Sequence, residues 1–237
     1  MQLELPRTGL NGSALVELLA QLALADRPAA PPSFVEGLAR WLGWKEAIAL
    51  SAVLQATPPA ARRSASPATA DAAALAATAA LTQLDAEFTR VRKAQALAID
   101  RALAQADARP GTGDHDFLPW RRCCFGLQQA MEAAAGALRA QARAELHRRA
   151  ATHPELATLA ALDATLAALL APREQAQLAL MPVLLEKHFM RPQTRQERAP
   201  GAFRDDMRRL LHAELELRLQ PALGLLEALR ATHTGLA

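Results

Sequence analysis

The chain has 237 residues, of which 51% are apolar, yet only 4% are aromatic and none is tyrosine. Its apolar residues are mainly alanine and leucine and lack the β-branched and aromatic character that strands favour, which predicts an all-α fold. With 27 basic and 24 acidic residues the formal charge is only +3, so bulk charge excludes a strongly basic nucleic-acid tail and indicates no particular partner.

The N-terminus and the cysteines indicate a cytoplasmic protein. The first six residues, Met-Gln-Leu-Glu-Leu-Pro, have neither the basic start nor the apolar run of a signal peptide. The longest apolar run, residues 156–171, contains Asp163, so we expect no transmembrane segment. Cys123 and Cys124 are the only cysteines, and two adjacent residues offer no disulfide framework.

The first 56 residues predict a small unit of three helices. We expect the helices at about residues 13–25, 33–41 and 44–55. Ser33 and Glu36 have the spacing of a capping box, in which each side chain satisfies a free backbone amide of the other. Apolar side chains are expected to hold the unit together, namely Trp41, Trp44, Ile48 and Val53.

Residues 57–70 contain three prolines and no periodic apolar pattern, which predicts a flexible linker. Four long helices are then expected at about residues 71–108, 116–151, 155–190 and 202–231. Because short connections make successive helices neighbours, residues 71–237 predict an elongated antiparallel bundle.

Several residues mark the ends and breaks of these long helices. Asp71 is expected to cap the first, and Asp114 or Asp116 the second, with Pro119 tolerated in its first turn. Thr152 and Glu155 again have capping-box spacing. Kinks or interruptions are expected at four positions, Pro172, Pro182, Pro221 and Gly224.

No pattern in the chain predicts catalysis. None of the six histidines lies three residues after a glutamate, so the di-iron pattern of helical bundles is absent. Cys123 or Cys124 could be a thiolate nucleophile near His115, but both sit at the start of a bundle helix, which favours small packed residues. The glycines form no phosphate loop or dinucleotide fingerprint, and no serine stands in a nucleophile elbow.

We therefore predict no catalytic residue, no metal and no cofactor, and a protein that is not an enzyme. A pocket with two or more convergent titratable side chains would argue against this prediction, and we expect none. Arginine clusters, such as Arg121 with Arg122 and Arg204 with Arg208 and Arg209, leave nucleic-acid binding as an alternative. They are interleaved with acidic residues and lack aromatic platforms for bases, which favours solvated helix faces.

The last predicted helix carries the candidate interaction surface, with residues Phe203, Met207, Leu211, Leu215 and Leu219. The apolar residues of this helix cover about 200° of its circumference, whereas a helix packed on one side needs only about 100°. Two explanations stay open: a central bundle helix with an internal Glu214–Arg218 ion pair, or a face offered to another chain.

Two stretches resemble a known family. The first includes Arg7-Thr8-Gly9-Leu10, Trp41-Leu42-Gly43-Trp44 and Ala47-Ile48-Ala49-Leu50-Ser51; the second includes Leu184-Leu185-Glu186-Lys187-His188-Phe189, Asp206-Met207, Glu214-Leu215, Arg218-Leu219-Gln220-Pro221 and Gly224-Leu225-Leu226. Together they resemble the uncharacterised proteobacterial family termed domain of unknown function 3348, over nearly the whole chain. The resemblance implies no catalytic residue. It implies an association with genes for a proton-channel-like membrane protein and a peptidoglycan-binding partner.

Since long bundles without a polar pocket offer surface rather than chemistry, we expect a non-enzymatic helical scaffold or adaptor. Its partner is expected to be another protein or a second copy of the chain. The resemblance adds the expectation of a cytoplasmic accessory of a bacterial envelope complex.

Overall fold

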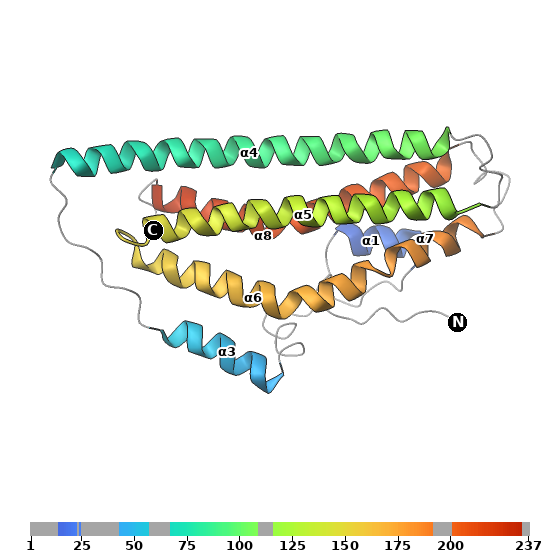
Figure 1. Ribbon diagram of the computed structural model, residues 1–237. Coiled ribbons are helices and arrows are strands. Elements are labelled where there is room, and N and C mark those ends of the chain that lie inside the picture. The colour runs from blue at the N-terminus through green and yellow to red at the C-terminus, as the bar shows by residue number, and fades with distance from the viewer. Residues whose placement is uncertain are drawn as a thin grey trace. The chain divides into compact units, whose positions relative to one another are not determined.

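The computed structural model describes residues 14–22, 24, 43–56, 67–108, 116–191 and 201–233 (Figure 1). All regular elements within these residues are helices, which confirms the predicted all-α class. They are α1 (Ala14–Gln21), α3 (Trp44–Gln55), α4 (Pro67–Asp107), α5 (Leu118–Arg149), α6 (Pro154–Leu178), α7 (Met181–Phe189) and α8 (Ala202–His233). The helix predicted at residues 33–41 lies outside the described residues.

The chain divides into two compact units, each assembled from three separate stretches of sequence. The first unit comprises Met1–Gly43, Ala94–Glu132 and Pro172–Arg218, and the second comprises Trp44–Lys93, Ala133–Ala171 and Leu219–Ala237. The four long helices α4, α5, α6 and α8 therefore contribute to both units. Since α1 belongs to the first unit and α3 to the second, the three-helix unit of residues 1–56 stays a prediction.

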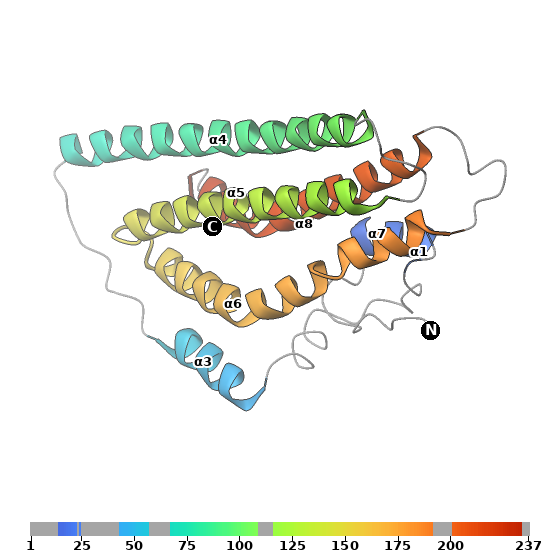
Figure 2. The same cartoon turned by 45° about the vertical axis from the view of Figure 1, so that its right-hand side comes forward.

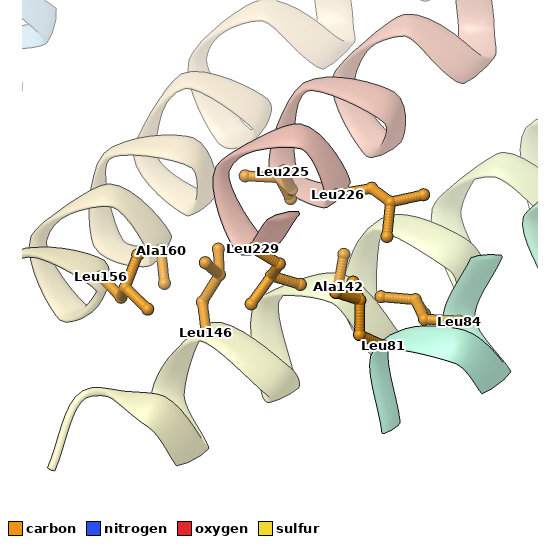
Figure 3. Packing of buried hydrophobic residues seen from close by; sticks show 9 residues of the cluster. All are labelled: Leu81, Leu84, Ala142, Leu146, Leu156, Ala160, Leu225, Leu226 and Leu229. Atoms are coloured by element: carbon orange, nitrogen blue, oxygen red, sulfur yellow. The ribbon is translucent and has the colours of Figure 1, made fainter. Parts of the chain in front are cut away.

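Within each unit, successive long helices run in opposite directions, as the colour sequence shows in both views (Figures 1 and 2). The interior of the second unit is a cluster of buried leucines and alanines from α4, α5, α6 and α8 (Figure 3). Its members are Leu81, Leu84, Ala142, Leu146, Leu156, Ala160, Leu225, Leu226 and Leu229. Each fully buried leucine contributes about 1.5–3 kcal/mol by leaving water, so packing holds this unit together.

The interior of the first unit combines aliphatic and aromatic side chains. Its fully buried members include Leu15, Ile99, Leu103, Met131, Leu185, Met207, Leu210, Leu211 and Leu215. Beside them, the Phe203 ring makes edge contacts with the rings of Trp120 and Phe189, at centroid distances of 5.4 and 5.0 Å. Aromatic pairs in this geometry add about 0.5–1.5 kcal/mol beyond burial.

The observed helix ends correct two predictions. Helix α4 begins at Pro67 and not at Asp71, so the last four residues of the predicted linker are helical. Proline suits the first turn because its missing N–H would have no partner there. The predicted Thr152 capping box is wrong, because the Thr152 hydroxyl donates to the Arg149 carbonyl at the end of α5 (3.1 Å). The Asp116 carboxylate, as predicted, accepts a hydrogen bond from the Leu118 amide (3.0 Å).

The prolines interrupt the helices less than expected. Pro172 lies inside α6, and the break falls at residues 179–180, so that Pro182 stands in the first turn of α7. Of the kink or short break expected at Pro221 and Gly224, the break does not occur, since α8 continues through both residues. Buried Leu219, Ala222 and Leu225 anchor the backbone on either side of them. Gly201, the residue before α8, has a φ of 85°, which is costly for any residue with a Cβ.

Candidate functional site

The structure buries most of the surface predicted on α8. Met207, Leu211, Leu215 and Leu219 are between 0 and 2% exposed, and Phe203 is half-buried among aromatic rings. Their proposed role as an interaction surface is therefore wrong, because neighbouring helices of the same chain cover the wide apolar arc. The arrangement agrees with the other explanation, a central helix.

The Glu214–Arg218 pair exists and lies in the interior of the first unit. The Arg218 Nε donates to Glu214 Oε1 at 2.9 Å, and Glu214 is 0% exposed. Gln128 completes the cluster, since its Nε2 lies 3.0 Å from Glu214 Oε2 and 3.1 Å from the Leu178 carbonyl. Burial raises the pKa of Glu214, while Arg218 and the Gln128 hydrogen bond oppose that shift.

Cys124 lies near Glu214 and is fully buried. Burial is the main cause that raises the pKa of the Cys124 thiol far above its ordinary value, and the Glu214 and Cys123 charges act in the same direction. A nucleophile needs the opposite shift, because the thiolate is the reactive form. The geometry therefore favours a packed apolar role for Cys124.

A histidine–carboxylate pair joins α7 to α8 in the first unit. His188 Nε2 lies 2.9 Å from Asp206 Oδ2, and the imidazole ring is 5.9 Å from the Phe203 ring. Among the described residues, no group of three or more His, Cys, Asp or Glu side chains could hold a metal ion. The pair ties α7 to α8.

Two buried ion clusters tie helices together in the second unit. Asp163 of α6 accepts hydrogen bonds from Arg139 Nε (2.9 Å) and Arg143 NH1 (3.0 Å) of α5. Arg149 of α5 bonds Glu145 (2.8 Å) and also donates to the Ala77 carbonyl of α4 (2.7 Å). These guanidinium groups bind carboxylates and a carbonyl group inside the second unit, and they thereby hold α5 against α4 and α6.

A groove lined by residues of α4 and α5 carries three titratable side chains, those of Glu87, Glu145 and Arg148. The expectation that no pocket would bring two such groups together is therefore wrong. The sequence gives no direct signal for this groove, because Glu87 and Glu145 are far apart in the chain. The i,i+4 spacing of Glu145 and Arg149 could have identified the ion pair, but not its burial.

Helix α3 exposes large apolar side chains. Trp44 is 82%, Leu54 60% and Ile48 52% exposed, and no residue of α3 is buried. The predicted role of Trp44 and Ile48 in holding an N-terminal unit together is therefore wrong, because both side chains face away from the half-buried side of the helix. Val53 is half-buried, and Trp41 lies outside the described residues.

Residues 154–189 are long and apolar enough, by length and composition alone, to cross a membrane, with a mean hydropathy of 1.4 in the best window. This corrects the expectation that no stretch would qualify, because the many alanines and leucines offset the charge of Asp163. One such segment is weak evidence for a span, and Asp163 is paired with two arginines of α5.

Comparison with known proteins supplies a family but no activity. The model of the family described as "Protein of unknown function (DUF3348)" matches residues 1–231. The chain belongs to this family. The match confirms the resemblance seen in the two sequence stretches and covers α1 to nearly the end of α8. No curated protein and no solved structure matches this DUF3348 chain.

Proposed function

We propose that the protein is a non-enzymatic helical adaptor that binds a protein partner through one face of α3. The observation that carries this proposal is the exposure of Trp44, Ile48 and Leu54 on a helix that buries none of its residues. At 100° per residue these three side chains fall within an arc of about 120°, close to the width of a packing stripe. We call this arc the α3 face.

The opposite side of α3 is only half-buried, at Ala49, Leu50 and Val53. A helix of 12 residues is marginal in water on its own, and most helices gain their stability by burying an apolar face. Here the largest apolar side chains are the most exposed ones. A partner that covers the α3 face would bury a tryptophan, the residue type most enriched at interface hot spots.

The chemistry of the α3 face favours a partner with an apolar groove over a second α3 helix. A symmetric helix pair would run along the seam formed by Trp44, Ile48, Ser51 and Gln55. Gln55 Nε2 donates to the Ser51 hydroxyl (2.9 Å), and pairing would bury both polar side chains in that seam. A partner groove that receives Trp44 and Ile48 would leave Ser51 and Gln55 at the rim of the groove, where both side chains stay in contact with water.

The arginines supply an argument against the alternative, nucleic-acid binding. Arg204 pairs with Asp107 (2.9 Å) and Arg208 with Asp100 (3.2 Å), so two members of one predicted cluster are each matched by an acid of α4. A phosphate-binding face needs unmatched positive charge, and its affinity falls steeply with salt. Interleaved pairs of this kind stabilise helix packing instead.

The finer proposal places this adaptor in the cytoplasm as an accessory of a bacterial envelope complex. It rests only on the gene association that the resemblance to the family implies. The α3 face supplies a surface that such an accessory requires.

Co-purification from the native host tests the proposal. The full chain should retain a specific set of proteins that a Trp44→Asp, Ile48→Asp double variant loses. Leu75→Asp is the matched control, because Leu75 is 73% exposed on α4 and lies outside the α3 face. Equal retention by all three proteins would contradict the proposal. Recovery of nucleic acid in place of proteins, with a strong dependence on salt, would support the alternative.

A further inference from the structure

The groove of the second unit has a volume of about 370 Å³, within the range of sites for small molecules. Ala80, Leu84 and Ala144 provide the apolar part of its lining. Gln83 and Gln141 add two carboxamides that can donate or accept hydrogen bonds. Glu87, Glu145 and Arg148 complete the lining, so that two carboxylates face one guanidinium group.

Glu145 is the distinctive residue of this groove. Its side chain is only 4% exposed, and its Oε1 accepts a hydrogen bond from Arg149 Nε at 2.8 Å. Arg149 is itself fixed by the carbonyls of Ala77 and Leu229. The other oxygen, Glu145 Oε2, is buried and accepts no hydrogen bond from any described residue, although the Arg148 guanidinium lies beside it as an ion pair. The charge at Glu145 Oε2 is therefore compensated from the groove side by this one exposed guanidinium group.

The two arginines that pair with the carboxylates of the groove are replaceable. The Arg148 and Arg90 side chains are each 67% exposed, and they contact Glu145 and Glu87 respectively. Because both guanidinium groups reach their carboxylates from solvent, each can turn back into water and be solvated there. An incoming cation can therefore take the place of Arg148 and donate a hydrogen bond to Glu145 Oε2.

We propose that this groove binds a small organic cation that carries a guanidinium or primary ammonium group on an aliphatic stem. The cationic group takes the position of the Arg148 guanidinium at Glu145 Oε2. The stem lies along Ala80, Leu84 and Ala144, and the carboxamides of Gln83 and Gln141 accept hydrogen bonds from a second donor. This site lies apart from the α3 face and does not depend on the adaptor proposal.

Calorimetric titration of the full chain with agmatine, which has a guanidinium group, a short aliphatic stem and an ammonium group, tests the proposal. We expect saturable binding that Glu145→Gln weakens at least about tenfold, equivalent to about 1.4 kcal/mol. Arg148→Ala should strengthen binding severalfold, because it removes the internal competitor. Glu227→Gln, an exposed glutamate on α8, should leave binding unchanged.

The opposite responses of Glu145→Gln and Arg148→Ala separate a built site from general attraction between charges. No saturable binding at concentrations up to about 10 mM would overturn the proposal. Equal binding of N-butylurea, which has a similar stem but no charge, would also overturn it. Circular dichroism shows whether the Glu145→Gln variant folds. If it does not fold, the Arg148→Ala variant alone tests the proposal. Stronger binding by this variant supports the site, and unchanged or weaker binding refutes it.

Discussion

Glu214 and Cys124 share the interior of the first unit, where water cannot solvate a charge. Both have raised pKa values, and burial is the largest cause in each case. The Glu214–Arg218 spacing inside a wide apolar arc made an internal ion pair one of two explanations, but the contact of Glu214 with Gln128 could not be predicted. Gln128 lies 86 residues away in sequence, and only the packing of α5 against α8 brings the two together.

The raised pKa of Glu214 predicts how stability depends on pH. Below its ordinary value of 4.5, the carboxyl is protonated in both the folded and the unfolded chain. As the pH rises above 4.5, the unfolded chain loses this proton first, so the contribution of Glu214 to stability falls until the pH passes its folded pKa. Glu214→Gln removes this effect, and the free-energy difference between wild type and variant should decline over that window.

Urea unfolding, followed by circular dichroism at a series of pH values, measures this difference. Glu227→Gln, the same substitution at an exposed glutamate of α8, serves as the control. A wild-type stability that rises relative to Glu214→Gln as the pH increases would contradict the account.

The buried thiol of Cys124 gives a second prediction. In a Cys123→Ser variant, Cys124 should not react with Ellman's reagent at about pH 8 while the protein is folded. It should react fully once urea unfolds the chain. Rapid reaction of the native variant would show that the thiol is accessible and ionised, contrary to its burial.

At the scale of elements, the existence of the helices was easier to predict than their surroundings. The observed bounds of α3 equal those predicted from sequence, because Gly43 marks the start of the helix and apolar residues recur up to Gln55. The exposure of Trp44 could not be predicted, because apolar residues at helical spacing are also the pattern of a face that is buried within the chain. The break considered at Pro221 does not occur for a related reason: buried residues on both sides keep α8 helical where local propensity favours a break.

The contrast between α3 and α8 makes a testable prediction. Trp44→Ala and Ile48→Ala should change the free energy of unfolding by no more than about 0.5 kcal/mol, because both side chains are exposed. Leu211→Ala should reduce it by about 2–5 kcal/mol, since Leu211 is 0% exposed. Chemical denaturation measures both. A large loss from the α3 variants would mean that this face packs within the chain.

For the whole molecule, the two compact units cut across the division predicted from sequence. The sequence predicted boundaries at residues 56 and 71 from local composition, whereas contacts join α1 to parts of α5, α7 and α8 in the first unit. Leu15 and Leu19 of α1 are buried, and Arg191 donates to the Leu22 carbonyl (2.8 Å). Such long-range contacts leave no trace in the local pattern.

A fragment of residues 71–237 should therefore be less stable than the full chain. It lacks the buried leucines of α1, and each fully buried leucine contributes about 1.5–3 kcal/mol. Differential scanning calorimetry should show a lower melting temperature for the fragment. An unchanged melting temperature would mean that α1 adds nothing to the first unit and that the predicted division is the better description.

The central claim is that the α3 face binds a protein. The most direct measurement places a photoreactive amino acid at position 48 in the full chain, in the native host, and identifies the crosslinked products by mass spectrometry. The account predicts a discrete adduct with a different protein, which is lost when Trp44→Asp is added and absent when the same amino acid replaces Leu75. An adduct with a second copy of the chain, or the same products from both positions, would contradict it.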